Sequence, residues 1–278
     1  MIQDCRLGLY EKAMPNHLSW PEKLAGARAA GFDYVEISVD ESEAKLARLR
    51  MSPAERLALV SQMADAGIRI ESMCLSGHRR FPLGSLDAAT RQTSLDIMRR
   101  AIELAADLGV RIIQIAGYDE YYNPRSAQTE AYFGENLCLS AEIAAQYGVI
   151  LGFETMETPF MDSVAKAMRW VTTVNSPYLQ VYPDSGNITN SALAENRSVL
   201  DDIASGAGHL VAVHLKESAP GKYRDTPYGT GHVDFKAIVA ASRQLGARRF
   251  TGEFWYAQGR EWQQYIAESA AFLRAQFA

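Results

Sequence analysis

The feature that most constrains this chain is a regular alternation of short β-branched runs with longer segments of helical periodicity. Such alternation is typical of parallel βα units, in which helices cover the faces of a buried sheet. Eight strand-like runs occur, at residues 6–12, 34–40, 69–76, 111–119, 149–156, 179–184, 210–218 and 249–256. Helices are expected at residues 20–31, 52–67, 86–109, 126–148, 162–175, 194–206, 234–246 and 259–276.

A glycine stands between helix and strand in several of these units. It recurs in "AAGFDYVEI", "ADAGIRIES", "ADLGVRIIQ", "AQYGVILGF" and "RQLGARRFTG". Glycine at this position allows the left-handed conformation in which many helices end. The recurrence indicates repeats of one βα unit.

The number of units favours one barrel over an open sheet. The 278 residues contain no break in composition and no linker, which fits a single (β/α)₈ TIM barrel over residues 1–278. An open α/β sheet is the alternative, and it predicts a glycine-rich phosphate-binding turn after the first strand. The segment there, "YEKAMP", has no such pattern.

Composition excludes several classes of protein. The net charge is −5 and no basic stripe is present, which argues against nucleic-acid binding. No stretch approaches the roughly 18 to 20 apolar residues of a membrane span, and the first residues do not resemble a signal peptide. The three cysteines lie far apart without CxxC spacing, which favours a reducing cytoplasm and argues against a disulfide framework or cysteine metal site.

Titratable residues interrupt the apolar runs at the ends of the last four strands. Side chains alternate between the two faces of a strand, so Val211, Val213 and Leu215 should face the helices. Ala212, His214 and Lys216 should then face the barrel axis, and the same alternation in the other strands turns these residues inward: Gly152, Glu154, Asp184, Thr251, Glu253 and Trp255. Active sites of TIM barrels lie at the carboxyl ends of the strands, where these groups are expected to meet.

Four of these inward groups form a plausible metal site. Three carboxylates and one imidazole suit Mn²⁺, Mg²⁺, Co²⁺ or Zn²⁺, with open positions for a substrate. Taken singly, each residue has a structural alternative, an ion pair for a carboxylate or a hydrogen-bonded core position for the histidine. Taken together, four buried unpaired groups would be costly without an ion. We therefore predict one divalent metal ion held by Glu154, Asp184, His214 and Glu253.

Several motifs give the chain a resemblance to a known family. The stretches "GLYEKAMP", "FDYVEISVDE", "SMCLSGHRRFPLGS", "QIAGYDEYY", "YPDSGN", "HLVAVHLKES" and "PYGTGHVDF" resemble the L-ribulose-5-phosphate 3-epimerases, which belong to the xylose-isomerase-like barrels. The resemblance runs from the first strand into the eighth. It implies that the same four residues bind the metal, that Glu154 and Glu253 are the catalytic acid and base on opposite faces of C3, and that the chain forms a homodimer.

The chemistry agrees with this implication on physical grounds. A proton next to a ketone is too weakly acidic for a carboxylate in water, so a metal-bound cis-enediolate has to be stabilised. Inversion then requires a second carboxylate that returns the proton from the other face. The expected reaction interconverts L-xylulose 5-phosphate and L-ribulose 5-phosphate, and the sequence does not distinguish the two glutamates by direction.

Residues near the strand ends are candidates for substrate contacts. The loop after the third strand brings together Ser76, His78, Arg79 and Arg80, among which His78 is favoured, although a capping histidine or a solvated arginine ion pair is the alternative. Lys216 either meets the substrate or extends to solvent. The further candidates are Asn187, where similar ketohexose epimerases have a histidine, and the glycine-rich turn of residues 227–235, either an anion cradle or loop geometry. Glu36 and Glu157 are candidates to orient ligands or to bind substrate hydroxyls, with structural roles as the alternative.

Other functions are compatible with parts of this pattern. A 3-epimerase of free ketoses and an aldose–ketose isomerase would use the same metal site. A metal-dependent endonuclease is disfavoured by the negative charge and by the presence of only five histidines. A non-catalytic sugar-phosphate binding protein is disfavoured by the presence of both glutamates.

Overall fold

The alternation of strands and helices produces a closed parallel barrel in the computed structural model, which describes residues 4–278. Residues 1–3, which the predicted domain of residues 1–278 includes, lie outside the described part. The strands are β1 (Arg6–Tyr10), β2 (Tyr34–Val39), β3 (Arg69–Leu75), β4 (Ile112–Ala116), β5 (Ile150–Glu154), β6 (Leu179–Val181), β7 (Val213–Leu215) and β8 (Arg249–Gly252).

The eight strands follow one another around the barrel. The paired order is β6-β5-β4-β3-β2-β1-β8-β7, and all pairs are parallel. Parallel bridges of Val181 with Leu210 and of Asp184 with His214 close the gap between β6 and β7. The sheet is therefore closed, which confirms the predicted (β/α)₈ barrel; that it forms one domain over residues 1–278 stays a prediction.

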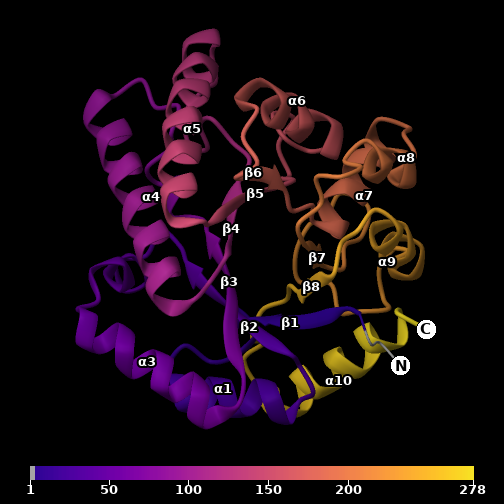
Figure 1. Ribbon diagram of the computed structural model, residues 1–278. Helices are drawn as coiled ribbons and strands as arrows, with labels where there is room; N and C mark the ends of the chain where they lie inside the picture. Colours follow the sequence, from indigo (N-terminus) through magenta and orange to yellow (C-terminus); the bar gives the residue numbers. More distant parts are fainter. Residues whose placement is uncertain (1–3) are drawn as a thin grey trace.

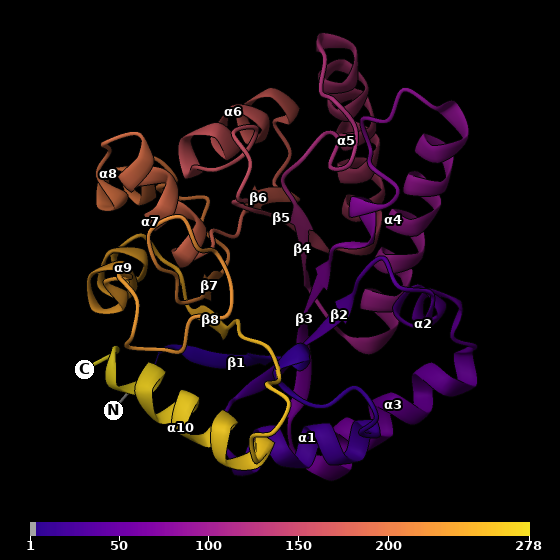
Figure 2. The same cartoon turned by 180° about the vertical axis from the view of Figure 1, so that it is seen from behind.

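The helices surround the strands on all sides (Figures 1 and 2). The α-helices are α1 (Trp20–Ala29), α2 (Glu43–Leu46), α3 (Pro53–Ala66), α4 (Ala88–Leu108), α5 (Ala127–Tyr147), α6 (Val164–Val174), α7 (Ser185–Ala194), α8 (Val199–Ala204), α9 (Phe235–Gln244) and α10 (Trp262–Ala275). Three short 3₁₀ helices are η1 (Glu11–Ala13), η2 (Ala47–Arg50) and η3 (Gly77–Arg79). Of the helices within residues 4–278, none combines the length and apolarity that a membrane span requires.

Local sequence signals explain where several helices begin and end. Ser52 begins α3 with a capping box to Glu55, and Gly67 ends the same helix at φ 63°. The same left-handed conformation occurs at the other glycines of the repeated junction, Gly31, Gly109, Gly148 and Gly246. These glycines are the positions where the sequence predicted a helix to stop.

The strands are shorter than their apolar runs suggested, and one helix was misplaced. The runs continue past the hydrogen-bonded ladder into the loops of the carboxyl end, so residues 11–13 form η1 and Glu253 follows β8. The helix expected at residues 194–206 is replaced by α7, which begins directly after Asp184, and by the short α8. Because Asp184 caps α7, the helix starts at the barrel mouth.

Val211, in the predicted seventh strand of residues 210–218, does not face the side that the alternation predicted. Val213 and Leu215 join the large apolar core, as predicted, but Val211 packs against Ala212, Tyr182 and Ile112 inside the barrel. A Cβ added to Gly152 would lie 3.1 Å from Val211 Cγ2. The prediction for Val211 is wrong because residues 211 and 212 lie outside β7, where regular alternation does not hold.

Candidate metal centre and active site

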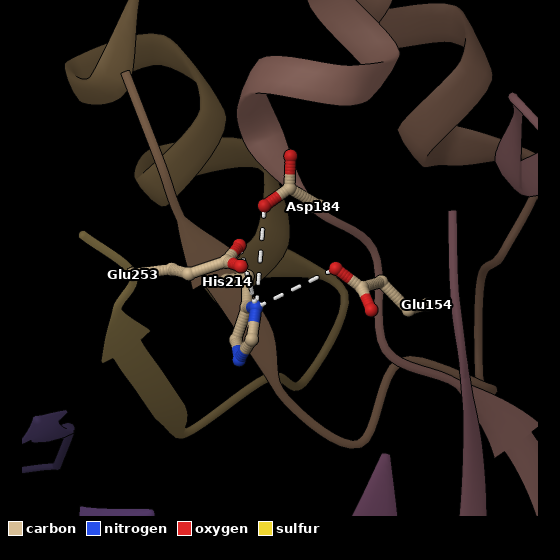
Figure 3. Close-up of side chains that lie close together, drawn as sticks. All are labelled: Glu154, Asp184, His214 and Glu253. Carbon is tan, nitrogen blue, oxygen red and sulfur yellow. Dashed lines mark hydrogen bonds and ion pairs between the residues drawn. The ribbon is translucent and has the colours of Figure 1, made fainter. Parts of the chain in front are cut away.

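Four side chains from the last four strands converge at the carboxyl end of the barrel (Figure 3). Glu154 ends β5, Asp184 follows β6, His214 lies in β7 and Glu253 follows β8. One ligand atom from each residue lies within 4.8 Å of the others, and all four residues are buried. The sequence-predicted ligands are therefore brought together.

His214 Nδ1 lies among the three carboxylates. It is 3.0 Å from Glu253 Oε2, 3.9 Å from Glu154 Oε1 and 4.0 Å from Asp184 Oδ2. In Figure 3, Glu154 and Glu253 point toward each other from opposite sides of the cluster. A small ion or substrate atom between them would face a carboxylate on each side.

The cluster has more acceptors than its own donors satisfy. Asp184 Oδ1 accepts a hydrogen bond from the backbone N–H of Asn187 at 2.7 Å and contacts Lys216 Nζ at 3.1 Å. Asp184 Oδ2 is buried and has no hydrogen-bond partner. Because a buried carboxylate oxygen without a partner is costly, this oxygen and the oxygen-rich donor set fit a hard divalent cation.

Burial and neighbouring charges shift the pKa values of the cluster strongly. Burial raises the pKa of Glu154 to about 7, and the charge of Glu253 adds to the effect. Burial likewise raises the pKa of Asp184 well above its ordinary value. Burial alone would raise the pKa of Glu253 too, but Lys216 and His214 outweigh it and hold that pKa well below its ordinary range. The divergence arises because burial dominates at Glu154 and Asp184, whereas the nearby positive charges dominate at Glu253.

Lys216 places an ammonium group among these carboxylates. Its Nζ lies 3.1 Å from Asp184 Oδ1 and 3.5 Å from Glu253 Oε2, and its side chain is 5% exposed. Burial would lower the pKa of Lys216, but Asp184 and Glu253 outweigh this and raise it. The alternative in which Lys216 extends to solvent is thus excluded, and it faces the barrel axis as the alternation predicted.

Two of the four predicted ligands, Glu154 and Glu253, line a cavity at the carboxyl end of the barrel. Four of the predicted substrate contacts line it beside Lys216, namely Ser76, Arg79, Glu157 and Asn187. Arg79 Nε and Asn187 Oδ1 are buried without a hydrogen-bond partner, and the Arg79 guanidinium lies over the Tyr121 ring at 4.7 Å. These polar groups are placed to meet a polar ligand.

His78, the favoured contact of the loop after the third strand, does not line this cavity. Its Nε2 lies 3.1 Å from the Ser94 carbonyl oxygen of α4, and burial lowers its pKa to about 4. The reason is the 3₁₀ turn of η3, in which residues three apart share a side, so Ser76 and Arg79 face the cavity together. Arg80 forms an exposed ion pair with Glu43 at 2.6 Å, the alternative considered for these arginines.

The glycine-rich turn of residues 227–235 cradles an anion that belongs to the protein. Glu217 Oε2 accepts a hydrogen bond from the Gly229 amide at 3.0 Å, and Glu217 Oε1 accepts one from Val233 at 3.2 Å. Both alternatives for this turn are therefore met by one contact, since Glu217 fixes the loop geometry. Glu217 is therefore structural.

Sequence reasoning missed several residues at the cavity. Lys12, Arg224, Trp255 and Tyr10 also line it. Trp255 was expected to face inward and Lys12 follows the first strand directly, so both positions carried a signal. Arg224 lies in a long irregular loop after β7, where no periodicity indicates the direction of a side chain.

Known proteins resemble this chain in sequence along almost its whole length. The L-ribulose-5-phosphate 3-epimerase UlaE of Salmonella paratyphi C is 43% identical over 98% of this chain and 95% of its own length. The protein of the same name from Salmonella paratyphi A is 42% identical with the same coverage. Residues 24–276 match the family model described as xylose isomerase-like TIM barrel.

Solved structures agree with the fold. A D-psicose 3-epimerase in the presence of D-fructose superposes with a TM-score of 0.79 at 20% identity, covering 97% of this chain and 98% of the other. An L-ribulose 3-epimerase superposes with a TM-score of 0.79 at 19% identity, covering 98% of this chain and 94% of the other. Together with the relatives from Salmonella, these matches confirm the resemblance read from the motifs. The chain belongs to the xylose isomerase-like TIM barrel family, in the group of the L-ribulose-5-phosphate 3-epimerases.

Proposed function

We propose that this protein is a metal-dependent 3-epimerase that interconverts L-xylulose 5-phosphate and L-ribulose 5-phosphate. The observation that carries the proposal is the pair Glu154 and Glu253, which face each other across a cluster with an unsatisfied carboxylate oxygen. The name and the identity of the relatives from Salmonella support this substrate class. An epimerase needs two proton-transfer groups on opposite faces of one carbon, and this arrangement provides them.

A divalent ion fits among the donors of the cluster. Glu154, Asp184, His214 and Glu253 would hold it, and Mn²⁺, Zn²⁺, Co²⁺ and Mg²⁺ all suit this donor set. When bound, the ion supplies stabilisation of the negative charge that develops on the substrate oxygens during proton removal.

The proton transfers belong to the two glutamates. One carboxylate removes the proton at C3, and the other delivers a proton to the opposite face, so the configuration at C3 inverts. In the reverse direction the two groups exchange these tasks. Burial of both carboxylates excludes water that would otherwise compete for the proton.

The remaining cavity residues are assigned to substrate binding. Asn187 Oδ1 is free to accept a hydrogen bond from a sugar hydroxyl, and Arg79 offers a guanidinium to an anionic group. Ser76, Glu157 and Lys216 complete the predicted contacts. His78 is left out of this assignment because it contacts α4.

Solvent deuterium provides the decisive experiment. L-Ribulose 5-phosphate is incubated with the protein in D₂O, with and without a chelator, and followed by NMR. We expect deuterium at C3, and none after the metal is removed. Deuterium at C1 instead would indicate an aldose–ketose isomerase, and equal turnover of the free sugar would replace the phosphate-specific activity by a 3-epimerase of free ketoses.

A non-catalytic sugar-phosphate binding protein is separated by one variant. Glu154→Gln should bind the sugar phosphate and fail to exchange the C3 proton, whereas a binding protein would show no exchange with either form.

The proposal also includes a homodimer and a cytoplasmic location, which rest on the family resemblance and on the three free cysteines. Light scattering of the purified protein measures the first.

A further inference from the structure

A fourth carboxylate, that of Glu36, contacts the cluster without being one of its candidate ligands. Glu36 is in the middle of β2, its side chain is fully buried, and it is absent from the group of four candidate ligands. Its Oε1 accepts a hydrogen bond from His214 Nε2 at 2.6 Å. Glu36 therefore contacts the one nitrogen of the ring that points away from the other three ligands.

The second oxygen of Glu36 is fixed by two hydroxyl groups. Oε2 accepts hydrogen bonds from Ser72 Oγ at 2.7 Å and from Tyr182 Oη at 2.9 Å. Ser72 belongs to β3, and Tyr182 follows β6. Both oxygens of this buried carboxylate are thus satisfied by donors from β3, from β7 and from the segment after β6, which leaves it one orientation.

The donor of each hydrogen bond around Glu36 can be identified, because a carboxylate accepts hydrogen bonds and cannot donate them. Tyr182 Oη donates to Glu36, so it must accept from Thr251 Oγ1, 2.6 Å away. Thr251 must then accept from Tyr34 Oη, 2.8 Å away. All donors of this hydrogen-bond network therefore point toward Glu36.

We propose that Glu36 is the positioning residue of the metal site, which holds the proton of His214 on Nε2 and directs the Nδ1 lone pair at the ion. The inference rests on the metal-dependent function proposed above. A neutral imidazole has one nitrogen that carries a proton and one with a free lone pair. The group that accepts a hydrogen bond from the protonated nitrogen therefore determines which nitrogen can bind a metal. The Tyr182 ring packs edge-to-face against the same imidazole, with 5.0 Å between the ring centroids, and holds it in place.

Metal affinity of the ion-free protein tests this role without any measurement of activity. Co²⁺ is titrated calorimetrically into chelator-treated wild type, Glu36→Gln and Tyr182→Phe. Removal of such a partner weakens metal binding ~10- to 100-fold, so we expect a dissociation constant raised by that factor in Glu36→Gln. Tyr182→Phe leaves the bond between Glu36 and His214 in place and should show a smaller increase.

Glu217→Gln provides a matched control. Glu217 is also a buried carboxylate, but it accepts hydrogen bonds from the backbone amides of Gly229 and Val233. Its replacement should lower the free energy of unfolding without changing the Co²⁺ dissociation constant. Equal loss of Co²⁺ affinity in both variants would mean that Glu36 acts through general stability and would overturn the inference.

The histidine ring itself gives a second readout if Glu36→Gln does not fold. In ¹⁵N NMR spectra of the Zn²⁺-loaded wild type, we expect the His214 proton on Nε2 and the metal on Nδ1. A ring bound through Nε2 would overturn the inference. If the wild type binds no metal, both the proposed function and this inference are wrong. If wild type and Glu36→Gln bind Co²⁺ equally well, only the inference is wrong.

Discussion

Two buried clusters of charged groups in this barrel have opposite compositions. One surrounds Glu11, which follows β1 and is contacted by Lys23 at 3.1 Å, by Arg48 Nη2 at 3.0 Å and by Lys45. It has one carboxylate for three cations. The cluster of Glu154, Asp184, His214 and Glu253 has three carboxylates, with Lys216 as the lysine beside it.

The two clusters differ in how many of their carboxylate oxygens have hydrogen-bond partners within the protein. Both oxygens of Glu11 accept hydrogen bonds, including one from the Ser38 amide at 2.9 Å, and the Trp20 ring lies 5.1 Å from the Arg48 guanidinium. In the other cluster, Asp184 Oδ2 has no partner. The first arrangement is complete and structural, whereas the second leaves a carboxylate oxygen without a partner and could hold a metal ion.

The pKa values follow the same division. Burial alone would raise the pKa of Glu11, but Arg48 and Lys45 outweigh it and hold that pKa well below its ordinary value. Burial and the nearby charge of Glu253 together raise the pKa of Glu154 to about 7. A buried carboxylate thus indicates a ligand site only when its charge is not matched by the protein.

The largest expected effect is on catalysis by the anionic cluster. Replacement Glu154→Gln, measured at saturating metal, should slow deuterium incorporation at C3 by ~10²- to 10⁴-fold, since general acid–base groups contribute that much. The sugar phosphate should still bind, as calorimetry can show. A rate within tenfold of wild type would mean that Glu154 is not a proton-transfer group.

The cationic cluster should respond in stability instead. Glu11→Gln leaves three buried cations facing a neutral amide, and breaking such a buried arrangement costs about 3 to 5 kcal/mol of unfolding free energy. Urea denaturation at neutral pH measures the loss. Glu43→Gln is the control, because its ion pair with Arg80 is exposed and should contribute less than about 1 kcal/mol. Similar losses in both variants would contradict the structural assignment.

The sequence predicted the anionic cluster and missed the cationic one for a physical reason. Glu154, Asp184, His214 and Glu253 each stand at the end of a strand, and parallel strands of a barrel end on one face. Glu11, Lys23, Lys45 and Arg48 come from a 3₁₀ turn, two helices and a second turn, whose relative placement no periodicity encodes.

Directions of side chains were predictable within the strands and just past their carboxyl ends. His214 and Lys216 face inward as alternation requires, but Val211 and His78 do not follow their predictions, because one lies outside β7 and the other in a 3₁₀ turn. Glu36 was expected either to orient a ligand or to be structural. Its contact with His214 depends on two strands 178 residues apart, and the sequence could not reveal that pairing.

Metal should stabilise one cluster and leave the other unaffected. Co²⁺ at a hundredfold excess over its dissociation constant should raise the unfolding free energy by about 2.7 kcal/mol. The same increment is expected in Glu11→Gln, because distant independent sites are additive. Asp184→Asn should show a smaller increment in urea denaturation. An increment that disappears in Glu11→Gln would show that the two clusters are coupled.

The excess of cations around Glu11 predicts a smaller effect, on the pH dependence of stability. Burial lowers the pKa of Lys45 from 10.5 to about 8; Glu11 opposes this shift, while Arg48 adds to it. Between these two values the unfolded chain holds a proton that the folded chain has released, so the unfolding free energy rises with pH. From about pH 7.5 to about pH 9.5, wild type should gain about 2 kcal/mol relative to Lys45→Met. Urea denaturation of both proteins at the two pH values measures this difference. An unchanged difference between the two proteins would mean that Glu11 holds Lys45 charged over this pH range, and that its single carboxylate offsets all three cations.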